Sequence, residues 1–344
     1  MRTRRPQRSE PPVRVTSATD PVAAFLSAHA QGRPVALATS ATAGAPRTVV
    51  RTTESWVSSF ATVRDLIGLS AASRVWVPGP LRATMNLFAA VHATHAGATL
   101  VGDPSAATHA HLTPGALAAL LADDADLAGM TVVVAGDRLS PALHARATDA
   151  GAEVHHYYGA AELSFVAWGP HADDLSPFPQ VEVAVRDGEI WVRSPYVCSG
   201  YDGTLGALRV DRGGFATVGD RGVLTSPPAG ARLMVLGRPG AVTTGGATVP
   251  VADVETALRT AASGDVVAVG VPHPTLGEVL VVVLTRAEDH PPVSAAAREV
   301  LEGAERPRLW FHVPELPLTP AGKVDRDALV SLVSSAEGWA GRLV

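Results

Sequence analysis

The chain has 344 residues, of which 47% are hydrophobic, and a formal net charge of -5. Such a chain can bury a large core, and it lacks the basic excess that nucleic-acid-binding proteins carry. No apolar run reaches the ~18 residues of a membrane span. The single cysteine, Cys198, excludes an internal disulfide framework and favours a reducing, cytoplasmic compartment.

The first twenty residues differ in composition from the rest of the chain. They are rich in arginine and proline and lack the apolar segment of a signal peptide, so we expect residues 1–20 to form a disordered tail. Further along, Pro114–Leu121 and Pro141–Ala150 predict helices, and the apolar run Thr131–Ala135 predicts a buried parallel strand. This alternation is typical of an α/β domain.

The second half of the chain has a different element order. Residues 181–193 alternate like a hairpin with Asp187 and Gly188 at its tip. After Gly237 the order predicts a compact α+β domain. Its expected elements are a hairpin, helix Val251–Ala262, strands Val266–Val271 and Val279–Thr285, helix Ser294–Gly303 and strand Trp310–Val313.

Only one of the 28 Lys and Arg residues is a lysine, and it is Lys323. Arginine offers a planar fork and lysine a compact point charge, so a site that needs the second cannot accept the first. An arginine-biased chain can also retain one lysine by chance, and the surrounding motif favours the functional reading. Residues 316–326, LPLTPAGKVDR, resemble the LPxTxxGKxxR signature of the adenylate-forming superfamily, the acyl-CoA synthetases and their relatives. The resemblance implies that Lys323 meets the acyl carboxylate and the α-phosphate during adenylation.

Residues 39–47, TSATAGAPR, are similar to the phosphate loop TSGTTGxPK of that family. Small residues and hydroxyls at this spacing let backbone N–H groups and side-chain oxygens surround phosphates. Ala41 and Ala43 replace a glycine and a threonine of the family pattern, and an arginine replaces its lysine. The resemblance assigns nucleotide contacts to Thr39, Ser40, Thr42, Gly44 and Arg47.

Two further segments carry the same resemblance. Residues 158–162, YGAAE, are similar to YGxTE, with Ala161 in place of the threonine. The match implies that Tyr158 stacks on adenine beside Gly159, and that Glu162 helps to hold Mg²⁺, a cation that prefers carboxylate oxygens. His156 stands where the family often contacts the adenine amino group, and its ring can accept or donate. Residues 214–220, GFATVGD, resemble GWxxTGD, whose aspartate, here Asp220, binds the ribose hydroxyls.

Residues 237–255 resemble the family's hinge and the first hairpin of its small domain. The match implies that Arg238 reaches the nucleotide and that Gly245 and Gly246 line a thiol tunnel. Pro239-Gly240 replaces the usual hinge aspartate, and the segment is one residue short.

The implied fold is an N-terminally truncated adenylate-forming large domain, residues 21–236, followed by a small mobile α+β domain, residues 237–335. The layout is most similar to that of the short actinobacterial o-succinylbenzoate-CoA ligases of menaquinone synthesis. Residues 77–86 lack the histidine of the PxFH motif found in many relatives. The substrate-pocket candidates are Gly136 and Arg82. Arg82 would either pair with a second carboxylate of the acid substrate or be a solvated loop arginine.

The sequence therefore predicts an AMP-forming ligase that joins a small carboxylic acid to CoA, with ATP and Mg²⁺, and with Lys323 and Glu162 as catalytic residues. Loading of a carrier protein stays open as an alternative. So does a catalytically weakened nucleotide- or acyl-binding relative, which the altered residues Ala41, Ala43 and Ala161 would suit. We expect neither a nucleic-acid partner nor a membrane span.

Overall fold

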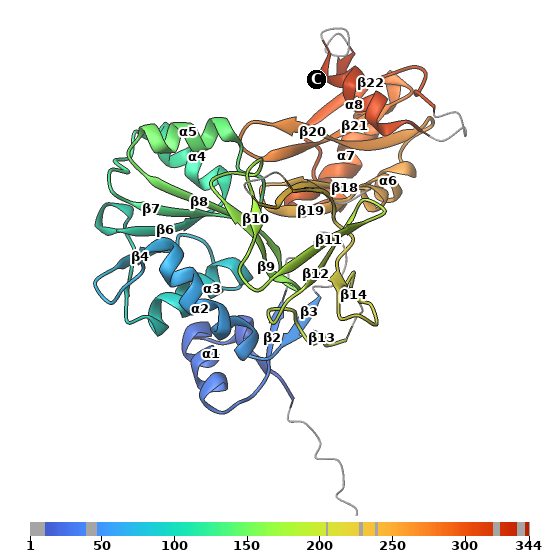
Figure 1. The fold of residues 1–344 in the computed structure, drawn as a ribbon. Coiled ribbons are helices and arrows are strands. Elements are labelled where there is room, and N and C mark those ends of the chain that lie inside the picture. Colours follow the sequence, from blue (N-terminus) through green and yellow to red (C-terminus); the bar gives the residue numbers. More distant parts are fainter. Residues whose placement is uncertain are drawn as a thin grey trace, which may run out of the picture.

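The structure, a computed structural model, describes residues 11–38, 47–203, 206–226, 230–237, 240–318, 324–335 and 341–343. Figure 1 shows a larger body, coloured blue to yellow along the chain, and a smaller one in orange and red. Among the described residues, no helix is long and apolar enough to cross a membrane.

The centre of the larger body is a seven-stranded sheet. Its strands, in spatial order, are β10 (Ser176–Pro177), β9 (Ser164–Gly169), β8 (Glu153–Ala160), β7 (Thr131–Val134), β6 (His109–Leu112), β4 (Arg74–Trp76) and β5 (Thr99–Val101). From β5 to β8 the strands pair in parallel, whereas β9 and β10 are antiparallel. All four residues of β7 are buried, as the apolar run predicted for a strand covered on both faces.

Helices cover both faces of this sheet (Figure 1). On one face of the sheet, Val132 and Val134 of β7 belong to the same hydrophobic cluster as residues of α4 and α5. On the other face, Val133 belongs to the cluster that contains residues of α2 and α3. Thr113 and Ser140 cap the N-termini of α4 and α5 through Ala116 N and Leu143 N, each followed by a proline at the first helical position. The helices are α1 (Pro21–Ala30), α2 (Glu54–Ile67), α3 (Thr84–His95), α4 (Pro114–Ala122) and α5 (Pro141–Asp149).

Two smaller sheets complete the large domain. One has the order β1 (Val13–Arg14), β2 (Val35–Ala38), β3 (Thr48–Arg51) and β13 (Gly200–Tyr201). The other has the order β14 (Arg209–Val210), β15 (Ala216–Thr217), β12 (Glu189–Arg193), β16 (Arg221–Thr225) and β17 (Arg232–Gly237), with β11 (Glu182–Arg186) paired to β12. The expected hairpin is thus present, and positive φ angles at Asp187 and Gly188 form its tight turn.

Part of the segment predicted to be a disordered tail is structured. Residues 13–17 form β1 and a 3-10 helix, η1 (Val15–Ser17), and β1 pairs in parallel with β2. Val15 is fully buried in the core. The arginine and proline content of the first twenty residues concealed this apolar anchor.

The smaller body has one mixed sheet with helices on both faces. Its strands are β19 (Ala247–Pro250), β18 (Ala241–Thr244), β21 (Gly277–Leu284), β22 (Leu309–His312) and β23 (Arg342–Leu343), with β20 (Val266–His273) also paired to β21. Its helices are α6 (Val251–Arg259), α7 (His290–Val300) and α8 (Arg326–Ser334). The smaller body also has short 3-10 turns at η3 (Ala287–Asp289) and η4 (Gly303–Glu305), and the larger body has one at η2 (Pro104–Ala106).

The expected α+β order is present, with element boundaries that differ by one to four residues. Helix α7 begins at His290, four residues before the expected start at Ser294. Pro291 and Pro292 lie in the first turn, where the missing N–H groups need no partner within the helix, so the prolines do not delay its start.

Candidate active site

A cavity of about 770 Å³ lies between the two bodies. Part of its wall follows the carboxyl ends of β7 and β8, the edge at which open α/β sheets bind ligands. The small domain supplies the opposite wall. Residues that line it are Gly136, Asp137, Arg138, His156, Tyr158, Gly159 and Asp220 from the large domain, and Thr243, Thr248, His273, Gly277 and Glu278 from the small one.

Tyr158 and Asp220 are 62 residues apart in sequence and meet in this cavity. The Tyr158 hydroxyl donates to Asp220 Oδ2 at 2.8 Å. The motif resemblance assigned adenine stacking to the tyrosine and ribose binding to the aspartate. Their contact brings both side chains together in the wall of this cavity.

His156 is 3% exposed, and its Nδ1 lies 2.9 Å from the carbonyl oxygen of Val134. Burial lowers the pKa of His156 to about 4, so the ring is neutral at neutral pH. A neutral ring that faces a carbonyl with Nδ1 donates from Nδ1 and accepts at Nε2. Of the two roles left open by the sequence, the structure favours the acceptor, which suits an adenine amino group.

Glu162 lies beside the cavity and not in its wall. Its Oε1 accepts a hydrogen bond of 2.8 Å from the Tyr201 hydroxyl. Arg51, fully buried at the end of β3, donates from Nη2 to the carbonyl oxygens of Ala161 and Tyr196, at 3.1 Å each. Burial lowers the pKa of Arg51 to about 10, and the charge of Glu162 acts in the opposite direction. A buried cation thus supports the backbone that carries Glu162.

The turn between β18 and β19 brings Gly245 and Gly246 to the large domain. A Cβ atom at Gly246 would lie 3.2 Å from the carbonyl oxygen of Gly136, and Gly246 N donates to Asp137 Oδ2 at 3.3 Å. Of the two thiol-tunnel candidates, Gly246 therefore lies next to the substrate-pocket candidate Gly136.

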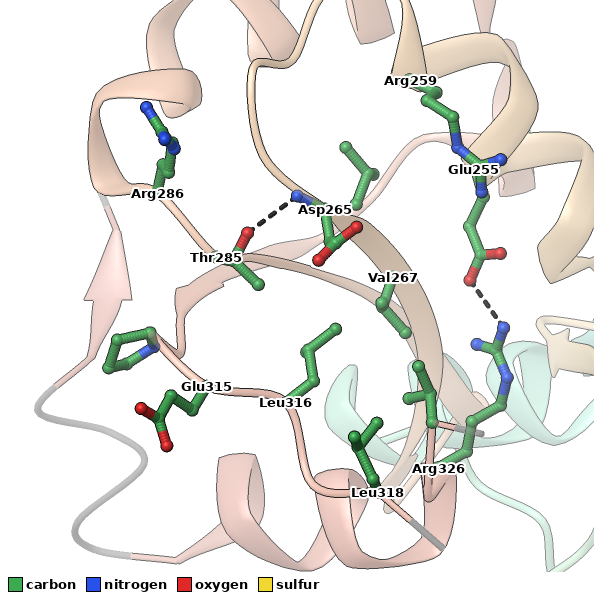
Figure 2. Close-up of a pocket in the computed structure, with 13 residues that line it drawn as sticks. Glu255, Arg259, Asp265, Val267, Thr285, Arg286, Glu315, Leu316, Leu318 and Arg326 are labelled. Carbon is green, nitrogen blue, oxygen red and sulfur yellow. Dashed lines mark hydrogen bonds and ion pairs between the residues drawn. The ribbon is translucent and has the colours of Figure 1, made fainter. Parts of the chain in front are cut away.

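A second cavity, of about 800 Å³, lies within the small domain. Figure 2 shows its wall, with the Glu255–Arg326 ion pair of 2.8 Å and the bond from Asp265 N to Thr285 Oγ1 of 2.7 Å. Leu318 and Val324, the residues that flank segment 319–323, line this cavity and not the first. Strand β20 reaches both cavities, because Val266 at one end lines the second cavity and His273 at the other end lines the first. The two residues are seven positions apart, which at ~3.3 Å per strand residue is roughly 20 Å.

Several site candidates are not assembled around the first cavity. Arg82 is exposed in the turn before α3 and does not line it. Arg47 is exposed directly before β3. The other candidates lie outside the described residues: Thr39, Ser40, Thr42, Gly44, Arg238 and Lys323.

Sequence reasoning missed four charged groups near the site: Arg51, Asp137, Arg138 and Glu278. Asp137 could have been found, because it follows a predicted parallel strand at its carboxyl end. Glu278 is a strand residue that faces the cavity only because β18 and β20 flank β21. Arg51 ends a short strand of otherwise ordinary character, and no sequence signal marks it.

Comparisons with known proteins agree with this geometry. Residues 35–202 match the family model described as AMP-binding enzyme. Over 331 residues the chain is 24% identical to a putative long chain fatty acid-CoA ligase, VraA, of Staphylococcus haemolyticus, covering 86% of this chain and 69% of the relative. A stretch of 137 residues is 34% identical to the 2-succinylbenzoate–CoA ligase of Salmonella typhimurium, covering 38% of this chain and 29% of that enzyme.

Solved structures with a similar fold are also known. The amide bond synthetase McbA from Marinactinospora thermotolerans matches with a TM-score of 0.69 at 28% identity, over 86% of this chain and 68% of that one. At the level of the family, these matches confirm the expectation of an AMP-forming acid–thiol ligase. By its motifs, its fold and its relatives, the chain is similar to proteins of the adenylate-forming, AMP-binding superfamily, and residues 35–202 carry the match to the AMP-binding enzyme model.

Proposed function

We propose that this protein is an ATP-dependent carboxylic acid:CoA ligase that works through an acyl-adenylate. The observation that carries the proposal is that the nucleoside candidates His156, Tyr158 and Asp220 share one cavity with small-domain residues from both sides of the Gly245-Gly246 turn. The large-domain wall of the cavity suits a nucleotide, and the small-domain wall suits a second substrate. Such a site can serve both steps of a two-step ligation.

In the first step the acid's carboxylate attacks the α-phosphate of ATP and releases pyrophosphate. His156 Nε2 accepts from the adenine amino group, and Asp220 accepts from the ribose hydroxyls. Lys323 stabilises the charge that develops between carboxylate and phosphate, as positioned cations do. Arg47 meets phosphate charge, and Arg238 reaches the nucleotide.

Glu162 fits a Mg²⁺ ion of the kind that takes one carboxylate from the protein and its other ligands from phosphates and water. A carboxylate keeps further lone pairs beyond the one that Tyr201 uses. When bound, the ion would neutralise phosphate charge. Within the described residues no group of three or more metal-ligating side chains occurs.

The proposal also names the acid substrate and the acceptor. We favour o-succinylbenzoate or another aryl or acyl acid, with CoA as acceptor, in the cytoplasm, and o-succinylbenzoate would place the enzyme in menaquinone synthesis. The partial match to a 2-succinylbenzoate–CoA ligase supports this acid. The match to an amide bond synthetase favours an amine as a second candidate acceptor.

Pyrophosphate exchange against a panel of aryl, acyl and long-chain acids tests the proposal. We expect ATP–pyrophosphate exchange that requires Mg²⁺ and one class of acid, followed by thioester formation when CoA is added. Amide formation with a simple amine, without thioester, would replace CoA by an amine as acceptor. Tight ATP binding without exchange for any acid would contradict the enzyme assignment and leave the weakened, nucleotide-binding alternative.

A further inference from the structure

Asp137 is a charged group of the cavity wall that adenylation does not use. It follows β7, two residues after Ala135, and precedes the Ser140 cap of α5, so two rigid elements fix its position. Its Oδ1 accepts from Arg138 N at 2.7 Å and its Oδ2 from Gly246 N at 3.3 Å. A Cβ atom at Gly277 would lie 2.1 Å from Oδ1. The carboxylate is therefore enclosed by the small-domain turn that faces the nucleotide site.

The surroundings of Asp137 suit a group that takes up a proton. Burial raises its pKa to about 6, more than the N–H groups of Arg138 and Gly246 lower it, and Glu278 adds to the rise. A carboxylate has about four lone-pair positions, and two backbone N–H groups occupy two of them. The other titratable side chains that line the cavity are Arg138, His156, Tyr157, Tyr158, Asp220, His273 and Glu278.

Most of these neighbours are less suited to accept a proton from a second substrate. His273 Nδ1 accepts from Thr275 N at 3.3 Å, so a neutral His273 ring carries its proton on Nε2. Burial lowers the pKa of His156 to about 4, so its ring is a weak base. Asp220 accepts from the Tyr158 hydroxyl. Burial raises the pKa of Glu278 as well, but its Oε2 accepts from Thr243 N at 2.9 Å within the sheet of the small domain, whereas Asp137 lies at the contact between the two domains. Arg138 is a cation paired with Asp173.

We propose that Asp137 is the general base of the second half-reaction and takes the proton of the acceptor thiol. The inference rests on the proposed function. The thiol S–H proton passes to a carboxylate oxygen of Asp137 while the sulfur bonds to the acyl carbon of the acyl-adenylate. The bond from that carbon to the phosphate oxygen breaks, and AMP leaves with the electron pair. Asp137 afterwards returns the proton to water.

The variant Asp137→Asn tests this role. An asparagine keeps an oxygen that can accept from Gly246 N, so the contact between the domains survives, but it cannot take up a proton. With the acid that gives the strongest exchange, we expect pyrophosphate exchange within twofold of the unmodified protein. Thioester formation with CoA at pH 7 should fall by about 100-fold or more, the usual contribution of a general base.

The pH profile separates a base from a structural support. In the unmodified protein, the single-turnover rate of thioester formation should rise with pH and level off above pH 6. In Asp137→Asn the rising limb should move towards the ordinary thiol pKa of about 8.5, and Asp137→Glu should restore part of the rate and the lower limb. Asp65→Asn makes the same chemical change on the exposed face of α2, outside the cavity wall, and should leave both steps and the profile unchanged.

Two results would overturn the inference. If Asp137→Asn slowed thioester formation equally at every pH, with the rising limb of the pH profile unchanged, Asp137 would only hold the small domain in position. A loss of exchange equal to the loss of thioester would place Asp137 in adenylation instead. Absence of exchange in the unmodified protein with every acid would show that the proposed function itself is wrong, which is a different result because no variant is needed to see it.

Discussion

Arg51 is the residue whose environment departs furthest from what its type prefers. It is fully buried, and within the described part of the chain its Nε and Nη1 atoms have no hydrogen-bond partner. Its guanidinium also lies 5.3 Å from the ring centroid of Trp56. Removing a charge from water is costly unless hydrogen bonds and nearby charges offset it. Arg51 holds the Ala161–Glu162 backbone in place through its hydrogen bond to the carbonyl oxygen of Ala161.

Replacement of Arg51 by an apolar residue of similar length separates these effects. Arg51→Met removes both the desolvation cost and the two bonds to carbonyl oxygens, so we expect the free energy of unfolding to change by less than about 1 kcal/mol. Arg51→Ala also leaves a cavity and should lose about 3 kcal/mol. Urea unfolding of both variants measures the difference. Equal losses would show that the carbonyl bonds, and not the packing, carry the stability.

Lys323 is the residue for which the sequence makes its sharpest functional claim. Lys323→Arg keeps the charge but widens the group, and a site built around one amine should not accept a planar fork. We expect pyrophosphate exchange to fall by at least about 100-fold, the scale of losing one positioned electrostatic contact, with an unchanged melting temperature. Exchange at the normal rate in a folded Lys323→Arg protein would refute the claim.

At the scale of elements, β20 runs from the cavity between the two bodies to the cavity within the small domain. Its His273 end lies at the nucleotide side, together with the Gly245-Gly246 turn, and its Val266 end lies with Leu318 and Val324. Hence this arrangement presents the turn and not the flanks of segment 319–323 to the nucleotide site. We infer that it is the arrangement for thiol transfer, and that adenylation requires the small domain to turn.

The turn itself offers a selective test. Gly246 has a φ of +84°, and an added Cβ would meet the Gly136 carbonyl oxygen at 3.2 Å. Gly246→Ala should therefore weaken the contact between the domains and reduce thioester formation by about tenfold, the effect of roughly 1.4 kcal/mol, while pyrophosphate exchange persists. Gly303→Ala is the matched control, because Gly303 has a φ of +54° with nothing within 4 Å of an added Cβ. An equal loss in both variants would trace the effect to general backbone strain.

At the scale of the whole molecule, the sequence predicted what depends on local pattern and motif order. The strand Thr131–Val134, the hairpin at Asp187-Gly188 and the α+β order after residue 237 follow from periodicity and turn chemistry. The contact of Asp137 with Gly246 could not be predicted, because it joins segments 109 residues apart through the packing of two domains. Residues 13–17 were missed because a short apolar anchor is hidden in a charged, proline-rich context.

Buried histidines make the stability of the whole molecule sensitive to acid. Burial lowers the pKa of His92 to about 4, of His111 to about 3 and of His156 to about 4. The ordinary value is about 6.5, so below that pH the unfolded chain binds more protons than the folded one, and unfolding becomes easier as pH falls towards 4. Asp137, with its raised pKa, partly offsets this loss.

We expect the free energy of unfolding to fall by about 3 kcal/mol per pH unit at the steepest, between pH 6 and 5, from three histidines and one opposing carboxyl group. Urea unfolding at pH 7, 6 and 5 measures the slope. His111→Gln removes one titrating ring and should lower the slope by roughly 1 kcal/mol per pH unit. A slope that does not change in that variant would exclude His111 as a source of the acid sensitivity.

Strand β23 has a practical consequence for handling the protein. Leu343 and Arg342 pair with Trp310 and Phe311 of β22, and His312 N donates to Gly341 O at 2.8 Å. The last described residues thus cover one edge of the small domain's sheet, and an uncovered edge is a template for pairing between molecules. Versions shortened to Ser335, the boundary expected from the sequence, would expose that edge and tend to self-associate. Expression and purification are therefore best planned with the chain intact through Leu343.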